Sequence, residues 1–325
     1  MTTSSAPLVF FRVLANQSGA PAALLMDIGP GNAADVLALF DSADFVALGG
    51  GMPCYYRTAL AVPLAEALSA AGWHQLVLGT LLREDKRLLQ EAIPQGTLLI
   101  EGDWYMAAPP KATGAQAASR ALSLQLAQLV AADAHTHDIE ALLRKDPTLS
   151  YHLLRLVNSL GMGTGRRITS FSQAILILGR QQLRRWVNLM LFAARQGDVR
   201  SGMLLARVAV RARLLEQLAK ARGLDKHTQD QAFIIGMFSL LGVLFGMPLT
   251  EVLAPLSMSD TVHQALLEYK GELGLMLRLS EAFEEGDDAA VAGQLAALGL
   301  GVAEFNAAAT DANLWMLGAL AACRT

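Results

Sequence analysis

The chain has 325 residues, a formal net charge of -3 at pH 7 and a pI near 6.1. This length allows two domains of ordinary size, and the nearly balanced charge gives no overall attraction to nucleic acids or to acidic membranes. The two cysteines, Cys54 and Cys323, lie far apart, which excludes a disulfide framework and a cysteine metal site. The balanced charge leads us to expect no nucleic-acid partner. We expect a cytoplasmic protein, because no basic region precedes the first apolar run as it would in a secretory signal.

Strands and helices are expected to alternate in the first third of the chain. Apolar runs on either side of the turn sequence Asn16-Gln17-Ser18-Gly19 predict two strands. The expected strands are residues 8–14, 22–28, 44–48, 75–78 and 97–100. The expected helices are residues 32–40, 57–71 and 83–91. This alternation is typical of an α/β unit with a partly parallel sheet.

A linker is predicted at residues 107–116, AAPPKATGAQ, which contain two prolines and no hydrophobic periodicity. From residue 117 onward the patterns predict only helices. We therefore expect an α/β domain at residues 1–106 and an all-α domain at residues 117–325.

The strongest helical pattern lies in residues 138–194. Asp146 followed by Pro147 is typical of an N-cap and a first helical turn. Leucines at helical spacing then predict one apolar face, at Leu149, Leu153, Leu156 and Leu160. Ser170 and Gln173 form a capping-box pattern before the next helix, and a third helix follows Gly179.

These segments resemble a known family. The sequences DPTLSYHLLRLVNS, RRITSFSQAILILG and QQLRRWVNLMLF resemble the start of the HDOD domain, a bacterial signalling module related to the HD phosphohydrolases. The resemblance continues through AFIIGMFSLLGVLFGMPLTEVL and covers the chain from about residue 118 to its end. It implies an all-helical HD-related domain that acts in signal transduction.

The first domain resembles the second half of an EAL domain, the barrel of cyclic di-GMP phosphodiesterases. The resemblance rests on ALLMDIGPGNAADVLALFDSADFVALGGG and on QGTLLIEGDWYMAAPP. A closed eight-stranded barrel typically takes about 250 residues. A domain of residues 1–106 is therefore expected to form a truncated half-barrel or a rearranged sheet.

The metal-binding positions that the EAL resemblance implies are mostly lost. Only Asp27 keeps a carboxylate, because Met26 and Ala47 stand where the family has an aspartate and a lysine. One carboxylate cannot hold a divalent cation that activates water. We therefore expect no hydrolysis by this domain.

The HD metal site is also expected to be missing. The His-Asp dipeptide of that superfamily would fall on Ser239 and Leu240. A literal dipeptide, His137-Asp138, lies about a hundred residues earlier, where Asp138 is better explained as a helix N-cap. The sequence thus predicts no metal, no cofactor and no enzyme activity.

A glycine-rich turn and a long uncharged stretch each have a simple structural explanation. The sequence Gly29-Pro30-Gly31-Asn32-Ala33-Ala34 fits a dinucleotide-binding fingerprint, but a simple strand-to-helix turn explains it better because proline removes one N–H donor. Residues 232–250 contain no charge and are long enough to raise the question of a membrane span. Amphipathic neighbours favour a buried central helix without a membrane span, and the GxxxG spacing of Gly242 and Gly246 then indicates close helix packing.

A basic patch is the candidate partner-binding site. Its five arginines lie in the glycine-rich loop and in the helix that follows, and they are Arg166, Arg167, Arg180, Arg184 and Arg185. Converging guanidinium groups bind carboxylates or phosphates. The alternative is a set of solvated helix faces.

The sequence therefore predicts a non-catalytic bacterial signalling protein that acts as a protein-interaction scaffold through its HDOD domain. The N-terminal unit is expected to pack on that domain or to mediate self-association. The alternatives are a sensor that binds cyclic di-GMP or another nucleotide without hydrolysis, and a residual phosphodiesterase.

Overall fold

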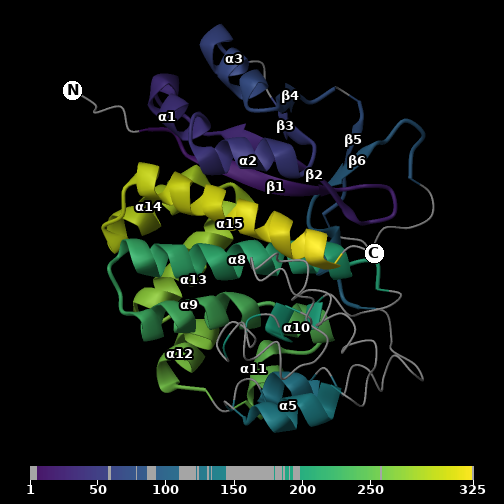
Figure 1. Ribbon diagram of the computed structural model, residues 1–325, viewed down its shortest axis with the longest axis vertical. Coiled ribbons are helices and arrows are strands. Elements are labelled where there is room, and N and C mark those ends of the chain that lie inside the picture. The colour runs from purple at the N-terminus through teal and green to yellow at the C-terminus, as the bar shows by residue number, and fades with distance from the viewer. Residues whose placement is uncertain are drawn as a thin grey trace.

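A computed structural model describes most of the chain. The described residues are 6–57, 60–77, 79–85, 93–109, 122, 124–129, 132, 134–143, 179, 185, 187–189, 191–192, 198–256 and 258–323. Residues 110–116 of the predicted linker and most of residues 138–194 lie outside this set. The chain forms a mixed α/β protein with a sheet near the N-terminus and a helical C-terminal part (Figure 1).

Six strands form one sheet in the order β4-β3-β2-β1-β6-β5. Their bounds are β1 Val9–Ala15, β2 Pro21–Ile28, β3 Cys54–Tyr56, β4 Trp73–Gln75, β5 Leu81–Arg83 and β6 Leu99–Glu101. Strand β1 is antiparallel to β2 and β6, whereas the pairs β2–β3, β3–β4 and β5–β6 are parallel. The predicted hairpin and the partly parallel sheet are therefore confirmed.

The turn between β1 and β2 follows its sequence chemistry. The Asn16 side-chain oxygen accepts hydrogen bonds from the backbone N–H groups of Ser18 and Ala20, both at 3.0 Å. Gly19 adopts a φ of 81°, a conformation that costs glycine little. These interactions set the register in which Val9 lies opposite Ile28.

The strand predicted at residues 44–48 is wrong. This segment is helix α2, Ala43–Gly51, which begins where the Ser42 hydroxyl accepts a hydrogen bond from the Phe45 N–H. Phe45 and Leu48 are both buried and lie three positions apart, the spacing of one helix face. A short apolar run does not by itself distinguish a strand from a helix.

The remaining N-terminal elements differ from the predictions mainly in their bounds. The segment expected as one helix at 32–40 is a 3-10 turn, η1 Ala33–Val36, followed by α1 Leu37–Phe40. Helix α3 covers Val62–Ala70, and the 3-10 turn η2 covers Trp104–Met106. Strands β3 and β5 were not predicted. Arg83, the first residue of the helix expected at 83–91, ends β5, and residues 86–91 lie outside the described residues.

The C-terminal part is helical, as predicted. Its described helices are α5 Thr136–Leu143, α8 Ser201–Ala221, α9 Lys226–Phe238, α10 Leu241–Phe245, α11 Leu249–Leu253, α12 Asp260–Glu268, α13 Gly271–Glu285, α14 Asp288–Leu298 and α15 Val302–Cys323. Helix α8 lies at the centre and packs against α9, α13 and α15. Side-chain N-caps begin three of these helices, at Asp225, Ser259 and Asp287.

The sheet and the helices share one hydrophobic core. Helix α15 packs on α8 and also on α2 and β1, so the end of the chain covers its beginning (Figure 1). Phe10 of β1 stacks on Phe283 of α13 with ring centroids 5.5 Å apart. The buried Asn306 of α15 accepts a hydrogen bond from the Val9 N–H and donates one to the Pro7 carbonyl. The domain boundaries remain predictions, but the packing across them is continuous.

One helical stretch of the described chain, Lys226–Phe245, has the length and hydropathy of a membrane span, and 56% of its window is buried inside the protein. That position is typical of a core helix. Helices α14 and α15 would pass the same test only as one span, and they meet at an angle of 108°. Gly242 lies close to the start of α11, where an added Cβ would be 3.2 Å from the Leu249 backbone nitrogen, whereas Gly246 is the left-handed C-cap of α10.

Candidate functional site

The positions that the EAL resemblance assigns to a metal site, Met26, Asp27 and Ala47, do not form a cation site among the described residues. Met26 is buried in β2, and the next side chain, Asp27, accepts a hydrogen bond from Arg57 Nε at 3.1 Å. Arg57 also donates to Glu101 at 2.6 Å. Ala47 is exposed on helix α2. The described part of the chain contains no group of three or more His, Cys, Asp or Glu side chains arranged to hold a metal ion.

The positions of the HD dipeptide lie at the end of α9. The Ser239 hydroxyl accepts a hydrogen bond from Arg211 Nη1 at 2.9 Å and donates one to the Gly236 carbonyl. Leu240 is buried in the core. The literal dipeptide His137-Asp138 lies exposed in the first turn of α5, so Asp138 is inside the helix and is not its N-cap.

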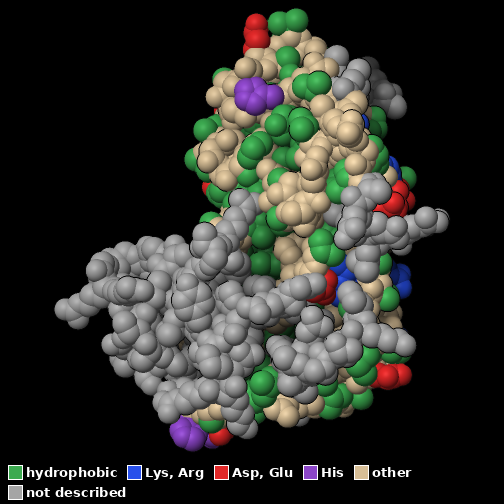
Figure 2. Space-filling model, turned by 90° about the vertical axis from the view of Figure 1, so that its right-hand side faces the viewer, with side chains coloured by type: hydrophobic (Ala, Val, Ile, Leu, Met, Phe, Trp, Pro, Cys, Tyr) green, Lys and Arg blue, Asp and Glu red, His purple; other side chains and the backbone are tan. Residues whose placement is uncertain are grey.

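Of the predicted basic patch, only Arg185 belongs to the described residues. Its guanidinium is 11% exposed, and it donates to Glu216 at 2.7 Å and to Asp230 at 2.5 Å. It also lies over the Phe233 ring, 4.5 Å from the centroid. On the face shown in Figure 2, hydrophobic and uncharged polar side chains predominate over the described part. Arg166, Arg167, Arg180 and Arg184 lie outside the described residues, so the patch stays a prediction.

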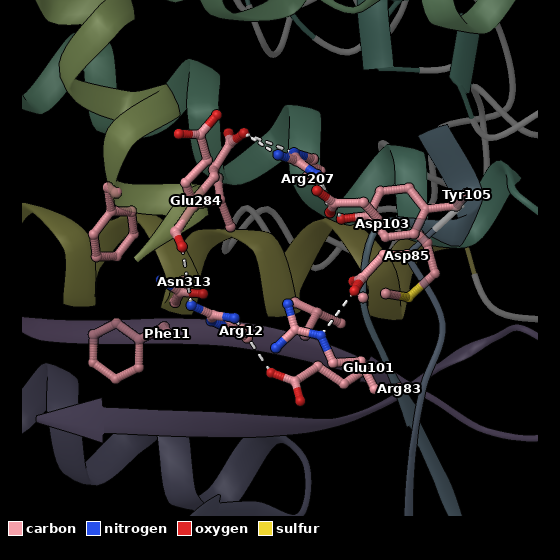
Figure 3. A pocket seen from close by; sticks show the side chains of 16 residues that line it. Phe11, Arg12, Arg83, Asp85, Glu101, Asp103, Tyr105, Arg207, Glu284 and Asn313 are labelled. Carbon is pink, nitrogen blue, oxygen red and sulfur yellow. Dashed lines mark hydrogen bonds and ion pairs between the residues drawn. The ribbon is translucent and has the colours of Figure 1, made fainter. Parts of the chain in front are cut away.

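A cavity of about 300 Å³ lies where the sheet meets the helices. Strands β1, β5 and β6 and the turn η2 form one side, and helices α8, α13 and α15 form the other (Figure 3). Phe11, Val13, Met203, Val210 and Phe283 contribute apolar surface. Arginine and carboxylate side chains from both sides line the rest of the cavity.

Glu284 of α13 is the most heavily bonded carboxylate of this cavity. It accepts hydrogen bonds from Arg207 and Arg211, which lie four residues apart on one face of α8. Burial alone would raise the pKa of Glu284, but the two neighbouring guanidinium groups outweigh burial and leave its pKa below the ordinary value. Glu284 is therefore ionised in the folded protein at neutral pH.

Arg207 joins the helical side of the cavity to the sheet side. Besides Glu284, it contacts the Asp103 carboxylate at 2.5 Å and the Tyr105 hydroxyl at 3.2 Å. Burial raises the pKa of the Tyr105 phenol, so it remains a neutral hydrogen-bonding group. These contacts fix η2 against α8.

Arg12 of β1 lies in the middle of the cavity with much of its donor capacity unused (Figure 3). Its Nη1 reaches Glu101 and its Nη2 reaches the Glu285 carbonyl, both at a long 3.3 Å. Its Nε has no acceptor among the described residues. The Glu285 carboxylate lines the same cavity and has no ion-pair partner in the described part of the chain.

Sequence reasoning missed every residue of this cavity. Two signals were available: Arg12 interrupts an otherwise apolar strand, and Arg207 and Arg211 recur at helical spacing inside an apolar helix. A charged side chain at a buried position usually has a partner. No sequence pattern identifies the side chain with which each buried arginine pairs.

A family model and two relatives match parts of this chain. The family model of the HDOD domain matches residues 120–251. The Cyclic di-GMP phosphodiesterase CdgJ of Vibrio cholerae is 33% identical over 177 residues, which are 54% of this chain and 40% of that protein. The uncharacterized protein YuxH of Bacillus subtilis is 26% identical over 208 residues, 63% of this chain and 50% of that protein. The chain thus spans half or less of the length of these relatives.

One solved structure is similar in outline. It comes from Shewanella amazonensis and is provisionally named a phosphohydrolase. Its TM-score to this chain is 0.44 with 15% sequence identity, and the match covers 63% of this chain and 93% of the other. A likeness at this level carries no argument about function.

The comparisons correct one expectation and support another. The prediction of no enzyme activity is contradicted by the relative that is named a cyclic di-GMP phosphodiesterase. That prediction rested on missing cation ligands at positions transferred from family patterns, and such a transfer fails wherever other residues take over the role. The predicted EAL origin of the N-terminal sheet is not shown. The match of the HDOD family model to residues 120–251 supports the predicted HDOD domain in the helical part of the chain.

Proposed function

We propose that this protein works in cyclic di-GMP signalling and acts directly on that dinucleotide. The observation that carries the proposal is the HDOD domain together with 33% identity, over 54% of the chain, to a cyclic di-GMP phosphodiesterase. The cavity between the sheet and the helices, called the junction cavity from here on, supports it, because a space of about 300 Å³ that contains aromatic and arginine side chains is of the size of small-molecule sites.

Hydrolysis of a phosphodiester needs an activated water, which enzymes commonly obtain from divalent cations. Among the described residues, Asp27 is the carboxylate that the EAL resemblance assigns to such a cation, and Arg57 now holds it. One carboxylate engaged by an arginine does not fit a divalent cation, so the proposal assigns no metal ligand among the described residues.

The EAL origin of the sheet and the binding of a partner protein are parts of the same proposal. Strands β4 and β5 are the two edges of the described sheet, and sheet edges pair readily with another chain. Val77, two residues after the edge strand β4, is 65% exposed, and Leu98, directly before the inner strand β6, is 63% exposed. These features support self-association or partner binding through the N-terminal unit.

The test is direct. The purified full chain is titrated with cyclic di-GMP by calorimetry in the presence of a chelator, and product formation is then followed by chromatography with Mg²⁺ or Mn²⁺. We expect saturable binding without metal and slow formation of a linear dinucleotide with metal. Cyclic di-AMP serves as the ligand control. Absence of both binding heat and product at every metal concentration would remove the proposal.

A further inference from the structure

Two unsatisfied groups of opposite charge line the junction cavity. Each of its carboxylates except Glu285 has an arginine partner. Asp85 pairs with Arg83, Glu101 with Arg12 and Arg57, Asp103 with Arg207, and Glu284 with Arg207 and Arg211. Arg12 makes only two long hydrogen bonds, both at 3.3 Å. The cavity therefore presents a buried Arg12 Nε without an acceptor among the described residues, and a Glu285 carboxylate without an ion pair there.

The Arg12 guanidinium lies against the backbone at the end of α13. Arg12 Nη2 donates to the Glu285 carbonyl, so the guanidinium lies against the residue that carries the free carboxylate. The next residue, Gly286, ends α13 in the left-handed conformation with a φ of 75°. A Cβ at Gly286 would lie 2.3 Å from Arg12 Nη2, so the absence of a side chain there is what lets the guanidinium approach.

The charge balance limits the kind of ligand. The cavity lining contains more carboxylates than arginines; Arg207 is held by partly buried ion pairs, and Arg83 forms an exposed ion pair with Asp85. A phosphate group placed inside would face these carboxylates at short range. A neutral, planar group that offers both donors and acceptors along its edge fits better.

Guanine is such a group. Its O6 and N7 atoms are acceptors that an arginine fork matches, and its N1–H and 2-amino groups are donors that a carboxylate matches. Adenine presents an N1 lone pair where guanine presents a donor, so it would repel the same carboxylate. Phe11 and Tyr105 supply aromatic surface next to these polar groups.

We propose that the junction cavity binds one guanine base of a guanine nucleotide, with Arg12 donating to O6 and N7 and Glu285 accepting from N1–H and the 2-amino group. The choice of cyclic di-GMP as that nucleotide rests on the proposed function. A volume of about 300 Å³ takes one base with its ribose, so the phosphates and the second base lie outside.

The decisive variant is Glu285→Ala, because this side chain is exposed and has no ion pair that its loss would break. We expect its affinity for cyclic di-GMP to fall by roughly tenfold, the discrimination of one good bidentate contact, with little change for cyclic di-AMP and an unchanged melting temperature. Glu272→Ala is the matched control, since Glu272 is a partly exposed carboxylate at the other end of α13. Its dissociation constants should equal those of the wild type.

The outcomes separate the two proposals. If the wild type binds and cleaves cyclic di-GMP but Glu285→Ala keeps the full preference for guanine, the guanine site is wrong and the function stands. If the wild type neither binds nor cleaves the dinucleotide, the proposed function fails, and GMP and AMP are titrated instead. A preference for GMP that Glu285→Ala abolishes then supports the cavity assignment, and equal or absent binding of both overturns it.

Discussion

Glu284 shows how single residues hold the junction together. Its carboxylate is buried between Arg207 and Arg211, and both guanidinium groups are themselves almost fully buried. Removing one partner of such a group leaves an uncompensated charge inside the protein. The free-energy cost of that buried charge exceeds the net stabilisation that the intact ion pair provides. The stability of the junction therefore depends on the ionised form of Glu284.

This dependence predicts a pH effect. Because the pKa of Glu284 is lowered from 4.5 in the folded state, its contribution is fully present above about pH 4.5 and is lost as the pH falls through the lowered folded value. We expect Glu284→Gln to lower the free energy of unfolding at pH 7 by about 3 kcal/mol. The difference between wild type and variant should shrink as urea unfolding is repeated at pH values below 4.5.

Glu272→Gln is the control for this titration, because Glu272 forms only a half-exposed ion pair with Arg222. Such surface pairs contribute little to stability. A Glu284→Gln protein as stable as the wild type at pH 7 would contradict the role assigned to the carboxylate.

At the scale of elements, close helix packing depends on a glycine that the GxxxG pattern did not identify. Helices α8 and α9 cross at Gly236, where an added Cβ would lie 2.4 Å from the Ala212 Cα. The obstacle is backbone, which cannot move aside as a flexible side chain would. The packing of α9 on the central helix therefore requires glycine at this position.

We expect Gly236→Ala to destabilise the protein by roughly 1–3 kcal/mol or more through overpacking. Gly318→Ala is the matched control, since Gly318 lies within α15 and its added Cβ would meet nothing within 4 Å. Alanine favours helix over glycine by about 1 kcal/mol, so this variant should be slightly more stable. Thermal unfolding of both variants measures the contrast, and equal melting temperatures would refute it.

At the scale of the whole molecule, the N-terminal sheet depends on the end of the chain. Phe10 stacks on Phe283, which in turn packs edge-on against Phe305 of α15. Helix α15 also covers α2, and Gly51 of α2 lies directly under the Leu317 side chain. The buried surface of the sheet is thus completed by residues some 300 positions away.

This arrangement predicts that residues 1–109 do not fold alone. Without α8, α13 and α15, the fragment would expose Phe10, Phe11 and their apolar neighbours to water. We expect an aggregated or non-cooperatively unfolding fragment, whereas the full chain unfolds in a cooperative transition. Size-exclusion chromatography and thermal melts of both proteins test this, and a monodisperse fragment with a sharp melt would contradict the shared core.

The sequence by itself determined the features that depend on neighbouring residues: the β1–β2 hairpin with its Asn16 turn, the capped helices after residue 200 and the HDOD resemblance that the comparisons support. Only the tertiary structure decided that residues 44–48 are helical and that Arg12, Glu101, Arg207 and Glu284 surround one cavity. Local periodicity and capping are properties of adjacent residues. Ion pairing between residues separated by as many as 104 positions, such as Arg207 and Asp103, depends on how whole elements dock, and no short pattern encodes it.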